Sequence, residues 1–387
     1  MESLQKTFRP ILLFFAIVLF SSCSNSDDNP SSAKYWKMVS PGYGFTTAIR
    51  SDGTLWAWGY NEQGQLGTGN TVNSNIPVQI GTDSDWKAIA SGGTYACAIK
   101  TNGTLWAWGR PILGMTSYNG TIGPIWTPFQ VGTSTNWKWI SAGDASGLGI
   151  KTDGTLWTWG TSNGFVTEID GQTQPTQLGT DANWKSASIG VDHISAVKNN
   201  GTLWSWGYNF HGAIGNNVFG DGPITIVNYK QQEYSQASNW NNTFAGKHTV
   251  ALKNDGTLWA WGDNSSGELG IGNLADKNIP IQIGTNSDWK TFYASYIFTL
   301  AIKNDGTLWA WGENAIGQLG DGTTTNKNIP VKIGVDADWQ DVIFSNDHSF
   351  AKKADNTLWG WGYNAYGQLG NNTNTDSYVP VLIPCPQ

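Results

Sequence analysis

Short apolar runs return along this chain at regular intervals, and the first of them contains Leu55-Trp56-Ala57-Trp58. Successive side chains of a β-strand point to opposite faces, so the two tryptophans would share one face while Leu55 and Ala57 share the other. Runs this short, rich in aromatic residues and bounded by glycine and asparagine, are typical of strands rather than helices. The pattern therefore predicts an all-β chain.

Two tryptophan markers indicate that the chain consists of seven copies of one unit of about 50 residues. The leading tryptophan of each unit is Trp36, Trp86, Trp137, Trp184, Trp240, Trp289 or Trp339. The first tryptophan of the Leu-Trp-x-Trp-Gly element that follows is Trp56, Trp106, Trp157, Trp204, Trp259, Trp309 or Trp359. These units fill residues 36–387, which leaves no room for a second domain.

A turn signal separates two apolar runs in every unit. Asp-Gly or Asn-Gly pairs lie at 52–53, 102–103, 153–154, 200–201, 255–256 and 305–306, and the seventh unit has Asp355-Asn356. Such pairs predict type I′ hairpin turns, in which both central residues need positive φ, and asparagine is the best substitute for glycine there. Strand-like runs at 76–80 and 86–90 raise the count to four strands per unit. Four strands repeated seven times predict a seven-bladed β-propeller.

Packing between such blades explains the tryptophans. A bulky face needs a neighbour that offers small residues if the interior is to reach native density. One slot with small residues holds Ala57, Ala107, Thr158, Ser205, Ala260, Ala310 and Gly360, and another holds Ala48, Ala98, Gly149, Ala196, Ala251, Ala301 and Ala351. Three tryptophan slots in seven units place 21 of the 23 tryptophans in the core. Trp126 and Trp139 lie outside these slots, and Trp126 is the freer one because Trp139 falls in a predicted strand.

Composition and charge exclude several classes of function. Only 13% of the residues are charged, the net charge is −7, and no run of lysine or arginine occurs. Because phosphate binding needs a basic face, we expect no nucleic-acid partner.

The N-terminus has the pattern of an export signal. Lys6 and Arg9 precede an apolar stretch from Ile11 to Phe20 that is too short for a permanent membrane helix, so residues 1–22 are predicted to be a signal peptide. The stretch that ends at Cys23 resembles the lipobox of bacterial lipoproteins, and the Ser-Asn-Ser-Asp-Asp that follows resembles the export signal of Bacteroidota surface lipoproteins. This resemblance implies lipidation of Cys23, a flexible tether over 23–35 and an outer-membrane, surface-exposed location. Ordinary secretion with a free Cys23 is the alternative.

Two cysteines remain. Cys97 lies in a strand-like run and Cys385 lies two residues from the last residue of the sequence. They either form a disulfide, as an oxidising compartment allows, or stay as a buried thiol and a tail thiol.

The repeat Gly-x-x-His/aromatic-x-x-Ala-Ile-Lys-x-Asp-Gly-Thr-Leu-Trp-x-Trp-Gly-x-Asn-x-x-Gly-Gln-Leu-Gly resembles that of the regulator of chromosome condensation (RCC1) family. The segments 60–67 and 363–370 are the best copies of its second half. The resemblance covers 36–387 and implies a seven-bladed propeller, but fold does not fix function. Members of the family act in nucleotide exchange on a nuclear GTPase, in β-lactamase inhibition and in ultraviolet sensing. Here the tryptophans have a packing explanation, which disfavours light sensing.

Catalytic motifs are not evident. His193, His248 and His348 share one repeat slot with Phe45, Tyr95, Ser146 and Phe298, which indicates a structural position. Asp192-His193 and Asp347-His348 lack an accompanying Gly-x-Ser-x-Gly nucleophile, His211 stands alone, and loops such as the one at Asp321 do not follow a calcium-binding pattern. We therefore expect no enzyme activity, no cofactor and no metal site.

Binding is expected where the units depart from their own consensus. Units two to four depart most, at 110–114, 161–165 and the long connection 216–239. The aromatic residues of these regions are the candidate binding residues, namely Tyr118, Trp126, Phe129, Phe165, Phe219, Tyr229 and Tyr234. Such anchors favour a monomeric scaffold with a protein partner. Glycan binding is the alternative, because aromatic rings also stack on sugars, and inhibition of an enzyme comes third.

The chain ends on Val379-Pro380-Val381-Leu382-Ile383, which matches the run before each leading tryptophan. If that run belongs to the following blade, this strand must pair with the first blade and close the ring. We expect this closure, because it would hide an edge strand.

Overall fold

The computed structural model describes residues 33–110, 124–160, 174–190, 192–220, 232–233 and 239–387. Residues Lys34–Gln387 form one compact unit. Over the residues that the structure describes, its regular structure is β apart from one turn of 3₁₀-helix at Phe210–Gly212. Among the described residues, no helix has the length and apolar character needed to cross a membrane.

Seven four-stranded antiparallel sheets make up this unit, each from four consecutive strands. The innermost strands are β1 (Trp36–Pro41), β5 (Trp86–Ser91), β9 (Trp137–Ala142), β13 (Trp184–Ile189), β17 (Trp240–Ala245), β21 (Trp289–Ala294) and β25 (Trp339–Phe344). The second strands are β2 (Phe45–Arg50), β6 (Tyr95–Lys100), β10 (Ser146–Lys151), β14 (His193–Lys198), β18 (His248–Lys253), β22 (Phe298–Lys303) and β26 (His348–Lys353). The third strands, from the Leu-Trp-x-Trp-Gly elements, are β3 (Leu55–Gly59), β7 (Leu105–Gly109), β11 (Leu156–Gly160), β15 (Leu203–Gly207), β19 (Leu258–Gly262), β23 (Leu308–Gly312) and β27 (Leu358–Gly362). The outermost strands are β4 (Ser74–Ile80), β8 (Ile125–Val131), β12 (Thr176–Gln177), β16 (Gln232–Glu233), β20 (Lys277–Gln282), β24 (Lys327–Lys332) and β28 (Ser377–Ile383).

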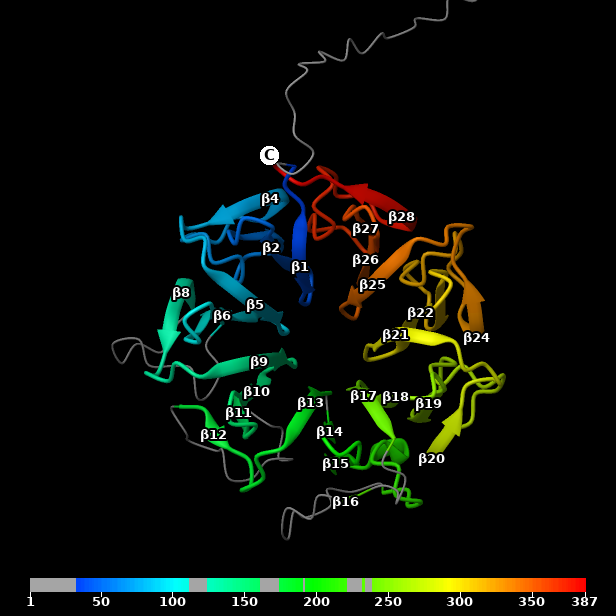
Figure 1. Ribbon diagram of the computed structural model, residues 1–387. Helices are drawn as coiled ribbons and strands as arrows, with labels where there is room; N and C mark the ends of the chain where they lie inside the picture. Colours follow the sequence, from blue (N-terminus) through cyan, green and yellow to red (C-terminus); the bar gives the residue numbers. More distant parts are fainter. Residues whose placement is uncertain (1–32, 111–123, 161–173, 191, 221–231, 234–238) are drawn as a thin grey trace, which may run out of the picture. The chain divides into compact units, whose positions relative to one another are not determined.

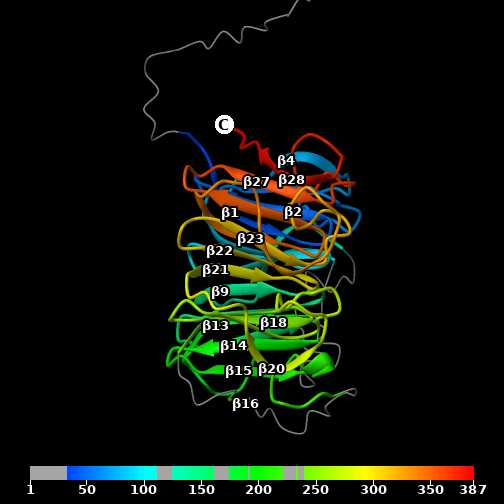
Figure 2. The same cartoon turned by 90° about the vertical axis from the view of Figure 1, so that its right-hand side faces the viewer.

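These sheets are the blades of a propeller, as predicted. In Figure 1 the innermost strands surround the centre and the outermost strands form the rim; Figure 2 shows the same ring after a quarter turn. Antiparallel order puts the β2–β3 turns and the entry to each innermost strand on one side, which we call the turn face. The β1–β2 turns and the β3–β4 loops lie on the other side, which we call the loop face, and the other blades follow the same pattern.

The hairpin turns differ from the predicted type. In the first blade Gly53 has φ of 82°, but Asp52 is not among the residues with positive φ. The Gly53 amide donates to the Arg50 carbonyl at 2.9 Å, and the Arg50 amide donates to the Thr54 carbonyl at 3.0 Å. This is a type I turn followed by a left-handed residue, so the prediction of type I′ is wrong. The Asp52 carboxylate accepts from the Thr54 amide, which favours this longer loop. In the seventh blade Asn356 takes the left-handed position with φ of 69°, as expected of the glycine substitute.

The leading tryptophans and the second tryptophan of each Leu-Trp-x-Trp-Gly element are buried, as predicted, whereas the first tryptophan of that element is half-buried in six of the seven blades. In the first blade Trp36 packs edge-on against Trp56, with ring centroids 5.9 Å apart, and contacts Trp58 at 5.3 Å. Ala57 of that blade belongs to the same buried cluster as Trp86 and Trp108 of the second, so small residues do face large ones between blades. The second slot of small residues lies beneath the tryptophans of its own blade.

Gly149 shows this second role. A Cβ atom added there would lie 2.5 Å from the Trp137 ring and 3.1 Å from the Trp159 ring of the same blade.

Each blade also encloses one cation beside its tryptophans, a feature that the repeat pattern alone did not reveal. Lys100 Nζ lies 4.8 Å from the Trp86 ring centroid and 4.7 Å from that of Trp106, and forms ion pairs with Asp83 and Asp85. The same slot holds Arg50, Lys151, Lys198, Lys253, Lys303 and Lys353. Cation–π attraction stabilises the otherwise costly burial of these charges, and within the described residues five of the seven also form an ion pair with an aspartate.

The ring closes in a way that contradicts the expected strand exchange. The C-terminal strand β28 pairs with β27 of its own blade, not with the first blade. Each unit supplies all four strands of one blade, so the first blade needs no strand from the chain end. The tail beyond β28 joins the two blades instead, because Trp36 Nε1 donates to the Pro384 carbonyl at 3.2 Å and Arg50 Nη1 donates to the Pro386 carbonyl at 2.9 Å.

Candidate binding face

Only some of the seven predicted binding residues lie within the described structure. Tyr118, Phe165, Tyr229 and Tyr234 lie outside the described residues. The remaining three, Trp126, Phe129 and Phe219, belong to the described structure.

Trp126 and Phe129 both belong to β8 and play different parts. Trp126 is 46% exposed, and one edge of its ring lies against Gly64 in the loop of the first blade, where an added Cβ would come within 2.4 Å of it. Phe129 pairs with Ala107 of β7 and packs onto the buried cluster between the second and third blades. Trp126 therefore presents an accessible aromatic surface, whereas Phe129 mainly extends the core.

Phe219 is 55% exposed in the connection that follows β15. Phe210, in the same connection, stacks on Tyr208 with ring centroids 5.3 Å apart. The fourth blade thus carries accessible aromatic rings on the loop face.

A group that the sequence interpretation missed lies where the first and seventh blades meet on the same face. We call Tyr43, Tyr60, Tyr363 and Tyr366 the tyrosine patch. The rings of Tyr60 and Tyr366 lie 4.8 Å apart, and those of Tyr363 and Tyr366 lie 6.0 Å apart. Tyr43 is 59% exposed and Tyr366 is 37% exposed.

Backbone and hydrogen-bond constraints position this patch. The Tyr60 amide donates to the Gly44 carbonyl at 2.8 Å, and the Tyr60 hydroxyl donates to Glu62 at 2.7 Å. This bond to Glu62 raises the pKa of Tyr60 to about 12, so the hydroxyl stays protonated at neutral pH. Rings held by neighbouring blades lose little side-chain entropy when a ligand covers them.

The patch escaped the sequence interpretation because its residues sit in the most regular copies of the repeat. Binding residues were sought where the units break down, yet the residue before the loop asparagine varies from unit to unit. It is Tyr60, Tyr208, Asp263, Glu313 and Tyr363 in five of the units. This variation, together with the expected contact between units seven and one in a closed ring, would have indicated that Tyr60 and Tyr363 lie near each other.

The histidine slot is structural, as its mixed occupancy indicated. His193 contacts the Thr249 hydroxyl through Nε2 at 2.6 Å, and His248 contacts Thr299 at 3.0 Å, in each case across a blade boundary. Burial lowers the pKa of His193 to about 3 and that of His248 to about 4, so both rings are neutral.

In the seventh blade, serine, histidine and aspartate come together but not in a catalytic arrangement. Ser345 Oγ lies 2.9 Å from His348 Nδ1 and donates to Asp347 at 2.6 Å. His348 Nε2 faces the buried Thr46 hydroxyl at 2.9 Å instead of an open site. In a catalytic triad the serine and the aspartate contact opposite ring nitrogens of the histidine, whereas here Ser345 and Asp347 both lie at Nδ1 of His348.

One unit carries a buried glutamate where the other loops of the Gly-Gln-Leu-Gly type have glutamine. Glu268 occupies the position of Gln65, Gln318 and Gln368, is fully buried, and accepts the Ser266 amide through Oε2 at 2.8 Å. Its Oε1 has no hydrogen-bond partner among the described residues. Desolvation raises the pKa of Glu268 to about 7, so the charge of this carboxyl changes near neutral pH.

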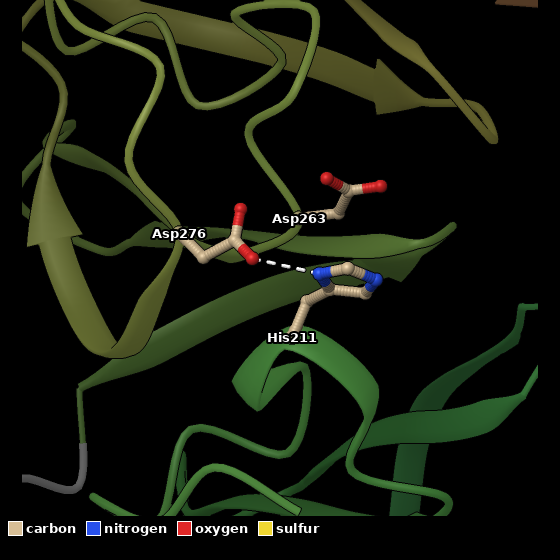
Figure 3. A group of neighbouring side chains, drawn as sticks. All are labelled: His211, Asp263 and Asp276. Atoms are coloured by element: carbon tan, nitrogen blue, oxygen red, sulfur yellow. Dashed lines mark hydrogen bonds and ion pairs between the residues drawn. The ribbon is translucent and has the colours of Figure 1, made fainter. Parts of the chain in front are cut away.

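His211, Asp263 and Asp276 form a cluster on the loop face between the fourth and fifth blades (Figure 3). Within the described part of the chain, these are the residues whose ligand atoms, within 4.8 Å of one another, could hold a metal ion. Their atoms already have protein partners, since His211 Nδ1 lies 2.7 Å from Asp276 Oδ2 and the other Asp276 oxygen accepts the Asn264 amide. Asp276 raises the pKa of His211. Lys247 lies 4.0 Å from Asp263, so the geometry fits an ion-pair network between blades better than a metal centre.

These features define a class, namely a β-propeller of tryptophan-rich repeats with accessible aromatic residues on its loop face. A family model for the RCC1-like domain matches residues 125–387, and a model for the regulator of chromosome condensation (RCC1) repeat matches residues 52–99. The chain belongs to the RCC1-like domain family.

Relatives of known identity agree with this assignment. The ultraviolet-B receptor UVR8 of Arabidopsis thaliana is 26% identical over 264 residues, which is 67% of this chain and 48% of the receptor, so the match spans about half of that relative. The structure of Prp20p from Saccharomyces cerevisiae has a TM-score of 0.74 at 18% identity, with 91% of this chain and 88% of Prp20p covered. Human WBSCR16 has a TM-score of 0.75 at 17% identity, with 86% and 95% covered. At this identity the structural matches show the fold alone. Prp20p itself is described by its binding to Gsp1p and histones.

Proposed function

We propose that this protein is a non-catalytic scaffold that binds another protein through its loop face. The observation that carries the proposal is the tyrosine patch, in which four tyrosines from the first and seventh blades gather and two of them are well exposed. Tyrosine and tryptophan dominate the energetic centres of protein interfaces because each buries a large area at low entropic cost. Trp126 and Phe219 add further accessible rings.

The chemistry of the patch favours a protein partner over catalysis. Its polar atoms are phenolic hydroxyls and one carboxylate, Glu62, that already accepts a hydrogen bond from Tyr60. The pKa values of Tyr60 and Tyr363 are both raised, so neither phenol supplies a base near neutral pH. The related Prp20p, a propeller of the same fold, is described as binding protein partners.

The proposal includes attachment to the outer membrane through lipidated Cys23, with the segment up to 35 as tether, and exposure at the cell surface. The first strand begins at Trp36 on the turn face. The described chain therefore enters the propeller on the turn face, opposite the loop face that carries the tyrosine patch.

Affinity capture from the source cells tests this proposal. The full chain and a variant with Tyr43→Ser and Tyr366→Ser would be crosslinked and captured in parallel, with Leu382→Ser on β28 as a control of similar exposure, 54%. We expect one protein that is recovered with the wild type and the control and depleted about tenfold with the double variant. Equal recovery from all three would refute binding through the patch. Recovery of polysaccharide instead, confirmed on a glycan array, would replace the proposal with glycan binding.

A further inference from the structure

One position of the innermost strands carries a lysine in most blades. The residue that follows each leading tryptophan is Lys37, Lys87, Lys138, Lys185, Asn241, Lys290 and Gln340, in chain order. All five lysines are exposed, and the position lies at the turn-face entry of its strand. Of these lysines, Lys37, Lys87 and Lys138 line the central cavity from three neighbouring blades, whose innermost strands surround the centre of the ring (Figure 1). We call these three lysines the lysine arc.

These lysines differ from the enclosed cations beside the tryptophans. Lys100, Lys198, Lys303 and Lys353 each form an ion pair with an aspartate. Within the described residues, none of the five lysines that follow a leading tryptophan forms an ion pair. Lys185 donates to the neutral Asn241 at 2.7 Å, and Lys290 donates to the neutral Gln340 at 2.9 Å. The arc therefore keeps its positive charge, although the chain as a whole has a net charge of −7.

The arc opens onto a defined space. A central cavity of about 600 Å³ is lined at its turn-face end by Lys37, Lys87 and Lys138. Its walls include the apolar surfaces of Trp139 and Tyr293. A volume of this size accommodates a small organic or phosphorylated molecule. Walls of low polarizability also strengthen the field of the lysines inside the cavity, because less water screens them.

The opposing charges in the cavity are few and unevenly placed. Asp341 lines the seventh blade's side of the cavity and interacts electrostatically with Lys352 and Lys290. Asp144 lines the cavity at its loop-face end, because it follows β9. Neither acid forms an ion pair with Lys37, Lys87 or Lys138 within the described residues. The excess positive charge thus lies with the first three blades.

We propose that Lys37, Lys87 and Lys138 form a binding site for a compact polyanion with two or more phosphate groups, held at the turn-face mouth of the central cavity. Three ammonium groups from adjacent blades match several negative charges on one ligand, and their long side chains adjust to its shape. This site is separate from the tyrosine patch and does not depend on the proposed protein partner.

Calorimetric titration with inorganic tripolyphosphate tests the site. We expect the full chain to bind at low salt and the affinity to fall as sodium chloride is added, because each contact releases counterions. The variant with Lys37→Gln, Lys87→Gln and Lys138→Gln should lose about tenfold or more in affinity. Lys290→Gln is the matched control, since it has the same position and exposure but lies outside the cavity lining and near Asp341, and it should change affinity by less than about twofold.

Two results would overturn the proposal, namely no heat of binding at millimolar tripolyphosphate, or equal losses in the triple variant and the control. Lys87→Gln alone should give an intermediate loss, which keeps the test valid if the triple variant is unstable. Co-sedimentation with vesicles of phosphatidylglycerol, compared with phosphatidylcholine, identifies the source of the phosphate. Binding to the former that requires the three lysines would assign the site to lipid headgroups, and tripolyphosphate binding without it would assign the site to a soluble anion.

Discussion

The indole Nε1 of Trp58 in the first blade donates to the main-chain carbonyl of Gln368 in the seventh blade at 2.8 Å. Trp108, Trp311 and Trp361 make the same bond to the loop of the blade before them. The repeat thus uses one tryptophan both to fill the core and to fix the Gly-Gln-Leu-Gly loop of its neighbour. Across the seam, this bond ties the two ends of the ring together.

Trp58→Phe should destabilise the propeller by about 2–3 kcal/mol, because it removes buried volume and leaves the Gln368 carbonyl without its donor. Trp289→Phe provides a control, since Trp289 is similarly buried and its Nε1 has no partner among the described residues. That variant should lose about 1 kcal/mol less. Urea unfolding followed by circular dichroism measures both, and equal losses would show that the bond across the seam adds nothing.

Deletion of residues 384–387 should weaken ring closure while β28 stays in place. The deletion removes the carbonyl acceptors of Trp36 Nε1 and Arg50 Nη1. It also removes Cys385, which packs on the buried cluster between the first and seventh blades. We expect a loss of about 2–3 kcal/mol, from two hydrogen bonds, one of them charged, and the lost packing. The substitution Gln387→Ala is the control, and it should leave the melting temperature nearly unchanged. If the deletion also leaves the melting temperature unchanged, the tail does not stabilise the contact between the first and seventh blades.

Glu268→Gln should stabilise the protein above neutral pH. The folded pKa of about 7 lies above the unfolded value near 4.5, so charging this carboxyl costs more in the folded state. Wild-type stability therefore falls as pH rises through this window and levels off above it, by an amount on the order of 3 kcal/mol. The variant restores the residue of the other units and should remove that loss, with equal stability of the two proteins near pH 4. Parallel pH dependences for both proteins between pH 5 and 8 would contradict the assignment.

Ser134→Asp should stabilise the third blade. Lys151 lies 3.5 Å from the Trp157 ring centroid but has only the Ser134 hydroxyl, at 3.2 Å, where Lys100 has Asp83. Burial without a carboxylate lowers the pKa of Lys151. A new ion pair should add about 0.5–1 kcal/mol at low salt and less at high salt.

The control for this prediction is Asn286→Asp in the sixth blade, where Lys303 already pairs with Asp288 at 3.3 Å. Melting temperatures at two salt concentrations measure both changes. An equal gain in the two blades would mean that the missing partner of Lys151 is not the cause.

Much of the fold could be predicted because the same pattern of large, small and turn-forming residues returns in every unit. Alternation in Leu55-Trp56-Ala57-Trp58 defines the third strand, and the small residue at Ala57 anticipates the tryptophans of the next blade. Ring closure could not be predicted, since a terminal strand such as β28 has the same pattern whether it pairs within its own blade or with the first. The turn type could not be predicted from the Asp-Gly pair alone, because it depends on the hydrogen bond that the Asp52 carboxylate accepts from the Thr54 amide.

The candidate binding face could be anticipated only in part from the sequence, because residues far apart in the chain form one surface only when the fold brings them together. Trp126 and Phe219 are accessible as expected of anchors, but Phe129 has a packing role that any large residue in that slot would share. Tyr60 and Tyr366 lie more than 300 residues apart in the chain, and their rings come into contact only because the ring of blades closes. The lysine arc has the same origin, since Lys37, Lys87 and Lys138 face one cavity from three different blades.

Site-specific photocrosslinking in the source cells tests the scaffold function most directly. A photoreactive phenylalanine analogue would replace Tyr43 on the loop face or Val335 on the turn face, which are 59% and 88% exposed. We predict that the probe at Tyr43 captures one protein reproducibly and that the probe at Val335 does not, although it is the more exposed. Capture of the same protein from both positions, or from Val335 alone, would contradict binding through the loop face.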